Sequence, residues 1–325
     1  MKIVVFGPDK RVGVWADDLV VDLARASAAN PAVAATPLPA DLLGLIEGGA
    51  AALAAAARVV AAAIAAPTSA NGVYKRADVQ LHAPHVRGAR IACAGGNFAD
   101  HAAAMANRGG TKTIDASDLK AVAEKLRANG IWGFWKVGRD AAEPGGDIQY
   151  PARTKRLDYE GELAIVLGKQ VKNFRSSDDL TPYVWGVTLF ADWSIRDGHE
   201  VDAPLKFGMA KNFDGSYSVG PCIVVGENID PSNVDVETWV NGDRRQQYNT
   251  RDMIVSFAEY LAYLSADFTF YPGDMISGGT AKGTAADSSP RLPEGGSDPA
   301  RFLKPGDAVE HRSPAVGTLG ARIVQ

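Results

Sequence analysis

The sequence is poor in cysteine and histidine, with two and five of them in 325 residues. Two thiols cannot form the disulfide framework of a small secreted domain, and alone they make no zinc site. Cys93 and Cys222 each lie in an apolar run, which predicts buried, reduced core thiols. A reducing compartment suits such thiols best, so we expect a cytoplasmic protein.

Long apolar runs are also lacking. The longest, residues 51–66, is rich in alanine, shorter than a membrane span and interrupted by Arg58, so it predicts a soluble helix. Near the start of the chain, Gly7, Pro8 and Asp9 break the apolar run, which indicates a strand and turn rather than a signal peptide. These features predict no membrane partner.

Neither sign of charge is in large excess, because 34 basic and 38 acidic side chains leave a net charge of -4. That balance provides no electrostatic reason to expect a nucleic-acid partner. The sequence contains no dinucleotide fingerprint and no phosphate-binding loop. With 46% hydrophobic residues the composition is that of an ordinary globular protein, long enough for one large domain and one small domain.

The chain divides into two regions of different pattern. Residues 1–87 combine short β-branched runs with alanine-rich helical stretches, which predicts a small N-terminal α/β domain. Residues 88–325 form the larger region, and from about residue 133 it consists mainly of short strand-like runs separated by turns. The expected fold class is therefore α+β and rich in β-strands.

Two polar segments interrupt the larger region. Residues 117–130 predict an amphipathic helix with Ser117 as N-cap and Gly130 at its end, either a lid over a site or a plain surface helix. Residues 283–300 are rich in glycine, serine and proline, so we expect an exposed loop.

Paired acids provide the first indication of chemistry. Glu160 and Glu162 are two residues apart at the entry to an apolar strand, where alternate side chains point to the same side. Two carboxylates on one face repel each other unless a cation neutralises them. A metal site and a solvated strand surface are both compatible with this segment alone.

A third acid strengthens the metal hypothesis. Asp192 ends another apolar strand, where a side chain is well placed to face a pocket. Three carboxylates provide hard oxygen ligands, which suit Mg²⁺, Mn²⁺ or Ca²⁺ better than zinc. Such a set leaves coordination positions open for water and for substrate oxygens.

The order of several motifs resembles that of the fumarylacetoacetate hydrolase family. The segments run over about residues 88–325 and include CAGGNFADH, DYEGELAIVLGK, TLFADWSIRD, AKNFDGSYSVGP and FTFYPGDMISGGT. The resemblance implies a fumarylacetoacetase C-terminal-like roll of mixed β-sheets, a lid segment at about residues 102–132 and a homodimer.

The same resemblance implies roles for individual residues. Glu160, Glu162 and Asp192 would be the metal ligands. Lys211 would lie close to the metal and its bound oxyanion, and His101 would be a general base acting on water. Thr280 would contact a substrate carboxylate.

The sequence departs from the family pattern at several of these positions. Many members place a glutamate three residues after the histidine, where Ala104 stands here, so His101 lacks its usual partner. Asp100, Asp115 or a lid carboxylate could substitute. His199 stands about where the family often has glutamine, and it could bind substrate, act as a second acid or base, or be an exposed loop histidine.

Further differences lie around the expected pocket. Ala191 replaces an asparagine before the metal aspartate, and Lys282 follows the altered segment Gly278–Ala281. Lys282 could contact an acidic substrate or be a solvated lysine. Arg196 and Asp197 are expected to brace the turn after Asp192 by pairing with each other or with neighbours.

These residues lead to three functional hypotheses. The first is a Mg²⁺-dependent hydrolase that cleaves a C–C bond in a small, acylpyruvate-like diketo acid through a metal-stabilised enolate. The second is a lyase, either a dehydratase or a decarboxylase, acting on a 2-oxo acid, with a sugar-derived acid as one option. The third is a metal-binding module without catalytic activity.

Overall fold

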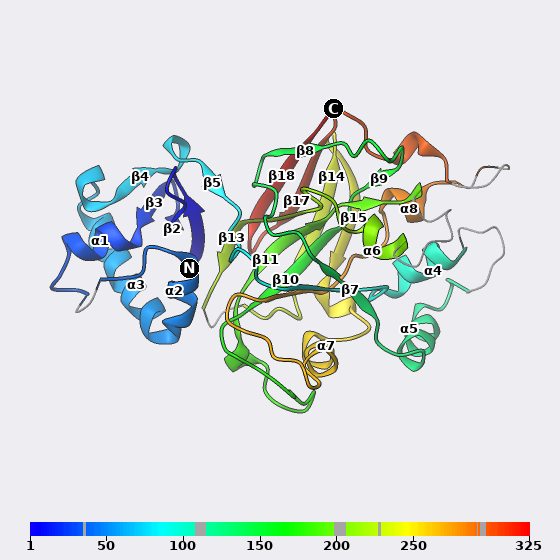
Figure 1. The fold of residues 1–325 in the computed structure, drawn as a ribbon, viewed down its shortest axis with the longest axis horizontal. Helices are drawn as coiled ribbons and strands as arrows, with labels where there is room; N and C mark the ends of the chain where they lie inside the picture. The colour runs from blue at the N-terminus through cyan, green and yellow to red at the C-terminus, as the bar shows by residue number, and fades with distance from the viewer. Residues whose placement is uncertain (35–36, 108–114, 198–205, 227–228, 291, 293–296) are drawn as a thin grey trace.

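The computed structural model describes residues 1–34, 37–107, 115–197, 206–226, 229–290, 292 and 297–325. Figure 1 shows a small N-terminal lobe beside a larger body that holds most of the strands. The lobe contains three helices and four of the short strands, which are β1 (Lys2–Phe6), β2 (Arg11–Ala16), β3 (Leu19–Asp22), α1 (Leu23–Ala29), α2 (Leu42–Glu47), α3 (Gly49–Ala65) and β4 (Val73–Lys75).

One large sheet runs through both parts of the molecule. Its strands lie in the order β4-β3-β2-β1-β13-β11-β10-β16-β6-β7, and β5 (Leu81–His82) also pairs with β1. The strands of the body are β6 (Ile91–Ala94), β7 (Gly133–Lys136), β10 (Gly161–Leu167), β11 (Val184–Asp192), β13 (Tyr217–Val224) and β16 (Met275–Ser277). Because Lys2 of β1 lies opposite Val224 of β13, the N-terminal lobe continues the main sheet.

A second sheet of five strands packs against the first. Its order is β15 (Asp243–Asn249), β14 (Asp235–Val240), β17 (Ala308–Ser313), β18 (Gly317–Val324) and β8 (Asp147–Gln149). Side chains such as Leu163, Val187 and Val309 fill the core between the sheets. A two-stranded ladder of β9 (Leu157–Asp158) and β12 (Ser194–Ile195) lies beside them. The observed fold is the mixed, β-rich arrangement expected from the sequence.

Several helices gather at one end of the body, as Figure 1 shows. These are α4 (Ala99–Asn107), α5 (Leu119–Ala128), α6 (Lys206–Ala210) and α8 (Ala285–Ser288), while α7 (Phe257–Leu264) lies lower on the body. The predicted surface helix is α5, with Val122 buried and Leu119 45% exposed. Its N-cap is Asp118 rather than Ser117, since Asp118 accepts a hydrogen bond from the Ala121 N–H.

The expectation of an exposed loop over residues 283–300 is wrong for the part that forms α8. Thr284, Ala285 and Ala286 are fully buried. The reason is the buried carboxylate of Asp158, which accepts the backbone N–H groups of Ala285 at 2.7 Å and Ala286 at 3.1 Å. A carboxylate at a helix N-terminus satisfies donors that otherwise lack partners, so α8 is held inside the body.

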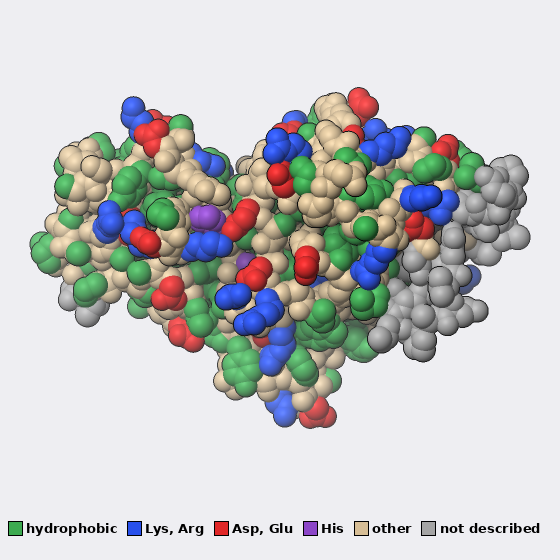
Figure 2. Space-filling model, turned by 45° about the horizontal axis from the view of Figure 1, so that its top comes forward, with side chains coloured by type: hydrophobic (Ala, Val, Ile, Leu, Met, Phe, Trp, Pro, Cys, Tyr) green, Lys and Arg blue, Asp and Glu red, His purple; other side chains and the backbone are tan. Residues whose placement is uncertain are grey.

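Other bulk expectations can be compared with the structure directly. Cys93 and Cys222 are buried free thiols, as predicted. None of the helices in the described ranges combines the length and apolarity needed to cross a lipid bilayer. Figure 2 shows basic and acidic side chains interspersed over the face in view.

Candidate active site

Three carboxylates converge where β10 begins and β11 ends. Glu160 directly precedes β10 and Glu162 lies within it, so the strand period directs both to one side. β11 runs antiparallel, and the Asp192 N–H donates to the Glu160 carbonyl at 3.0 Å. One oxygen from each of the three buried carboxylates lies within 4.8 Å of the others. The structure therefore brings together the three predicted metal ligands.

Gly161, between the two glutamates, contacts the opposite sheet. A Cβ atom at this position would lie 2.2 Å from Thr238 Oγ1 and 2.5 Å from His311 Nδ1. Gln246 accepts the Gly161 N–H at 3.1 Å, and the Tyr248 hydroxyl donates to the Gly161 carbonyl at 2.9 Å. Only glycine allows this close packing, which fixes the backbone that carries both glutamates.

Lys211, a predicted site residue, lies directly beside these ligands. Its ammonium group donates to the carboxylates of Glu160 and Asp192 and to the Ser194 hydroxyl, at 2.6 Å for Asp192 and 2.7 Å for Ser194. Although burial opposes the charged form, Asp192 and Glu160 outweigh it and raise the pKa of Lys211. Lys211 therefore holds positive charge against the ligand set.

Lys136 is a site residue that sequence reasoning missed. It lies on β7, its side chain is fully buried, and its ammonium group forms an ion pair with Asp192. It also donates to the carbonyls of Lys211 at 2.6 Å and Ser216 at 2.8 Å. A lysine within an otherwise apolar strand was the available signal, because lysines are almost never buried without a partner.

Arg196 provides the third buried cation. Its guanidinium group binds Glu160 and also Asp158, the latter at 2.8 Å. Asp197 instead accepts hydrogen bonds from Thr154 and from the backbone of Lys155, each at 2.6 Å. Both residues thus pair with neighbours, as expected from the sequence.

The ligand set and its partners form a carboxylate cluster with unequal charges. Four buried carboxylates, from Asp158, Glu160, Glu162 and Asp192, meet three buried cations, from Lys136, Arg196 and Lys211. With all seven groups ionised, the acids would exceed the bases by one negative charge, an excess that a bound cation would balance.

The two glutamates differ in how their charge is balanced. Burial by itself would raise the pKa of Glu160, but Arg196 and Lys211 outweigh it and lower that pKa well below its usual range. Burial, followed by the charges of Asp192 and Glu160, raises the pKa of Glu162 well above its usual range. Among the described residues Glu162 has a hydrogen bond from Ser277 but no ion pair. A hard divalent cation fits this position.

His101 lies on α4 beside the ligands. It is 7% exposed, and its Nε2 atom is 4.0 Å from an oxygen of Glu160. Its Nδ1 atom is 2.7 Å from Asp287 Oδ2, and the Asp287 side chain is fully buried on α8. The Gly283 N–H also donates to Asp287 at 3.0 Å. His101 therefore has a rigid carboxylate partner on the side opposite to Glu160.

Asp287 replaces the partner that is missing at Ala104, and it was not among the predicted substitutes. Asp100 accepts the backbone N–H of His101 at 2.6 Å rather than contacting the ring. The available sequence signal was Thr284, three residues before Asp287. The Thr284 hydroxyl accepts the Asp287 N–H as a helix N-cap, which marks a helix start within the presumed loop.

The three predicted substrate-binding residues differ in their surroundings. The Thr280 hydroxyl donates to the Gly161 carbonyl at 3.0 Å and accepts from Gln246 at 2.8 Å, so it braces the strand of the two glutamates. Lys282 is exposed, and its backbone N–H lies 3.4 Å from Asp100. His199 lies outside the described residues.

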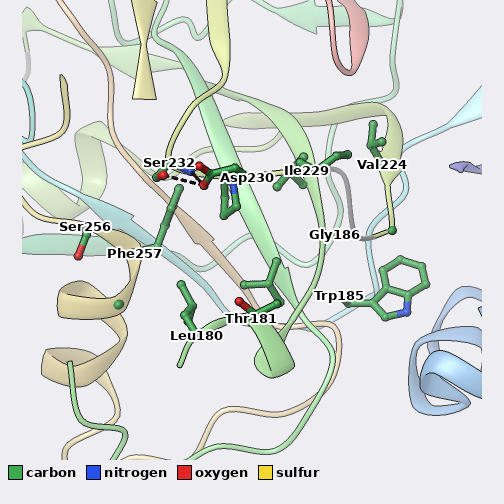
Figure 3. Close-up of a pocket in the computed structure, with 15 residues that line it drawn as sticks. Leu180, Thr181, Trp185, Gly186, Val224, Ile229, Asp230, Ser232, Ser256 and Phe257 are labelled. Atoms are coloured by element: carbon green, nitrogen blue, oxygen red, sulfur yellow. Dashed lines mark hydrogen bonds between the residues drawn. The ribbon is translucent and has the colours of Figure 1, made fainter. Parts of the chain in front are cut away.

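A separate hollow in the body differs in chemistry from this site. Its volume is about 530 Å³, and residues of β11, α7 and the segment around Ile229 line it. Figure 3 shows these lining residues. Apolar side chains such as Trp185 and Phe257 dominate its lining, and Asp230 accepts a hydrogen bond from Ser232 at 2.6 Å. It lies toward the start of β11, whereas Asp192 ends that strand. The convergence of charged groups, rather than volume, indicates where chemistry is carried out.

Comparison with known proteins agrees with the motif order. Residues 90–324 match the family described as fumarylacetoacetate (FAA) hydrolase C-terminal. The chain belongs to the fumarylacetoacetate hydrolase family. The matched range covers most of the region in which the sequence motifs resembled this family, so that prediction is confirmed.

Named relatives in this family extend over most of the chain. Oxaloacetate tautomerase YisK of Bacillus subtilis (strain 168) is 31% identical over 255 residues, which cover 77% of this chain and 75% of the relative. The mitochondrial oxaloacetate tautomerase FAHD2A of Homo sapiens is 28% identical over 288 residues, which cover 88% and 81%.

A solved structure in this family supports the fold. The fumarylacetoacetate hydrolase from psychrophilic Exiguobacterium antarcticum superposes with a TM-score of 0.72 at 26% identity, covering 100% of this chain and 99% of that one. The superposition extends over the N-terminal lobe as well as the body, so the shared likeness is not confined to the region that carries the carboxylate cluster.

Proposed function

We propose that this protein is a Mg²⁺-dependent enzyme that interconverts the keto and enol forms of a small 2-oxo acid. The observation that carries the proposal is the buried convergence of Glu160, Glu162 and Asp192 beside Lys211 and His101. These groups combine a place for a divalent cation, a fixed positive charge and an imidazole within a few ångströms.

Each group has a distinct part in the proposed reaction. Glu160, Glu162 and Asp192 would hold the cation, which when bound acts as a Lewis acid toward the oxo and carboxylate oxygens of the substrate. Lys211 adds a fixed positive charge beside the oxygen that becomes negative in the enolate. His101 would take a proton from the carbon next to the oxo group and deliver it to the enolate oxygen, or carry it in the reverse direction, while Asp287 holds the ring in place.

The names of the relatives support tautomerisation as the first candidate. Both YisK and FAHD2A are oxaloacetate tautomerases. Moving one proton between carbon and oxygen needs one base and stabilisation of one negative oxygen. His101 and Lys211 supply these two requirements.

Hydrolysis of a C–C bond, the first hypothesis from the sequence, is the second candidate. The His101–Asp287 pair favours it, because an imidazole held by a carboxylate can take a proton from water. Water would add to the distal carbonyl of an acylpyruvate, the C–C bond would break, and the enolate of pyruvate would leave and take up a proton. Of the two lyase reactions, dehydration would pass through the enolate of its substrate before the hydroxyl leaves, and decarboxylation would form an enolate as CO2 leaves.

Product analysis with Mg²⁺ distinguishes these candidates. The enol of oxaloacetate, an acylpyruvate and a 2-oxo-3-deoxy sugar acid would each be incubated with wild type and with Glu162→Gln. We expect loss of enol absorbance above the background rate with wild type, and the background rate with the variant. Cleavage of the acylpyruvate would favour hydrolysis, and dehydration or decarboxylation would favour a lyase. Metal binding without turnover of any compound would favour the non-catalytic module.

We also propose a homodimer in a reducing, cytoplasmic setting. The resemblance to the family supports the dimer, and the two buried free thiols are compatible with a reducing compartment. Light scattering after size-exclusion chromatography should give twice the chain mass of 34.2 kDa. A single-chain mass at micromolar concentration would contradict the dimer.

A further inference from the structure

Three side chains on and beside β7 lead from solvent to the carboxylate cluster. Trp132, Phe134 and Lys136 are two residues apart, so a strand directs them to the same side. Their exposure falls along the series: Trp132 is 49% exposed, Phe134 is half-buried and Lys136 is 3% exposed. Because Lys136 pairs with Asp192, the series ends at the predicted metal ligands.

Phe207 of α6 joins this series from a second element. Its ring packs edge-on against Phe134 at 5.3 Å and against Trp132 at 5.8 Å between centroids. The ammonium group of Lys211 lies 4.8 Å from the centre of the Phe134 ring. Trp132, Phe134 and Phe207 therefore form a continuous aromatic wall that begins at Lys211 and ends in solvent.

The backbone beneath Trp132 is shaped to receive the indole. A Cβ atom at Gly95 would lie 2.5 Å from the Trp132 ring, and one at Gly96 would lie 3.4 Å from it. The two glycines thus allow the ring to lie against the chain. Trp132 also borders a cavity of about 340 Å³, whose lining includes both glycines and Asn97. A half-exposed tryptophan in a fixed place beside a cavity can serve as a binding surface.

We propose that the aromatic wall binds a planar, apolar substituent of the substrate, so that the preferred substrate is a 2-oxo acid bearing an aryl or similar unsaturated group. This inference rests on the proposed function, since the 2-oxo acid end must lie at the carboxylate cluster for its substituent to reach the wall. Rings recognise flat apolar groups by stacking or edge contact, whereas a second carboxylate would lose its water against them without gaining a partner.

Two chelating probes that share one end test the wall without turnover. Oxalate presents only the two-oxygen end, whereas N-phenyloxamate presents the same kind of end with a phenyl group attached. Binding of each would be measured by calorimetry on the full chain in saturating Mg²⁺. We expect Trp132→Ala to weaken N-phenyloxamate about tenfold and oxalate less than about twofold. Trp132→Phe should restore most of the lost affinity.

Tyr263 provides a matched control because it is an aromatic residue of similar exposure, 55%, on α7. Tyr263→Ala should leave both affinities unchanged. Equal weakening of both probes by Trp132→Ala, or no effect on either, would overturn the aromatic wall while leaving the proposed function intact. Failure of wild type to bind oxalate in Mg²⁺ would overturn both proposals.

Discussion

The two faces of β10 are both buried, yet they are built from different chemistry. On one face Glu160 forms ion pairs with Arg196 and Lys211, and Glu162 lies beside it with a hydrogen bond from Ser277. On the other face Gly161 meets neutral polar groups, including Thr238 and His311. One face is electrostatically unbalanced, and the other has its hydrogen bonds largely satisfied.

The difference shows how carboxylates that repel each other can be kept close together at a cation site. Mutually repelling carboxylates would move apart if their strand could shift. The neutral face prevents that shift, because Gln246, Tyr248 and Thr280 hold the N–H and the carbonyl of Gly161. The neutral face therefore provides rigidity and the charged face provides reactivity. Four variants test this division, from the largest expected effect to the smallest.

Removing a ligand from the charged face should have the largest effect. Glu162→Gln removes a metal ligand, so Mg²⁺ affinity measured by calorimetry should fall at least about a hundredfold, more than outer-shell changes usually cost. In the absence of metal the variant should be more stable than wild type, because the burial and repulsion that raise the pKa of Glu162 no longer act. Unchanged Mg²⁺ affinity would exclude Glu162 as a ligand.

Filling the neutral face should mainly reduce stability. Gly161→Ala introduces a Cβ atom that clashes with Thr238 and His311, so the free energy of unfolding should fall by about 3 kcal/mol in urea denaturation. Gly320→Ala, where the nearest atom would be 3.8 Å away, is the control and should change little. Equal stability of the two variants would mean that the second sheet does not confine Gly161.

Changing the partner of His101 should reduce turnover without affecting metal affinity. Asp287→Asn keeps the size of the side chain but removes the charge that holds the imidazole, so kcat should fall about tenfold to a hundredfold. Asp298→Asn, a cap at the start of a separate 3-10 turn, is the matched control. Partial rescue by Ala104→Glu would support Asp287 as a substitute for the usual partner, and full activity of Asp287→Asn would remove it from that role.

The smallest expected effect concerns His311 on the neutral face. Burial lowers the pKa of His311 to about 3, whereas the unfolded chain takes up this proton near pH 6.5. A base whose folded pKa is lowered contributes stability that is present above pH 6.5 and is lost as pH falls toward 3. Between pH 7.5 and 5.5, this histidine should lower the free energy of unfolding by about 1.4 kcal/mol. In parallel denaturation curves, His311→Gln should lose about that much less stability than wild type over the same pH range. Identical pH dependence of the two proteins would contradict a neutral, buried His311.

Local patterns in the sequence predicted much of the fold, because strands that are buried on both faces can be recognised as continuous apolar runs. The runs that became β10, β11 and β13 are fully or almost fully buried, so their hydrophobic residues are continuous. β15 lacks such a run, because its sequence, DRRQQYN, is polar. Its Gln246 is nevertheless buried, because it forms hydrogen bonds with Thr280 and with Gly161 of β10. Polar residues used inside the protein look like surface residues until their partners are known.

The sequence likewise indicated some residues of the site and not others. The three acids and Lys211 follow from motifs that lie close together in sequence and come together in the structure. Lys136 and Asp287 lay outside these motifs. Lys136 is 75 residues from the Lys211 carbonyl that it binds, and Asp287 is 186 residues from His101.

The sequence alone determined that Glu160 and Glu162 share one side of a strand, because alternation along an extended chain follows from covalent geometry. The tertiary structure decided which carboxylate holds His101, which cations balance the four acids, and where the Trp132 ring lies. Those outcomes depend on contacts between distant segments, and such contacts form only when the sheets close and bring α4, α6 and α8 to one end of the body.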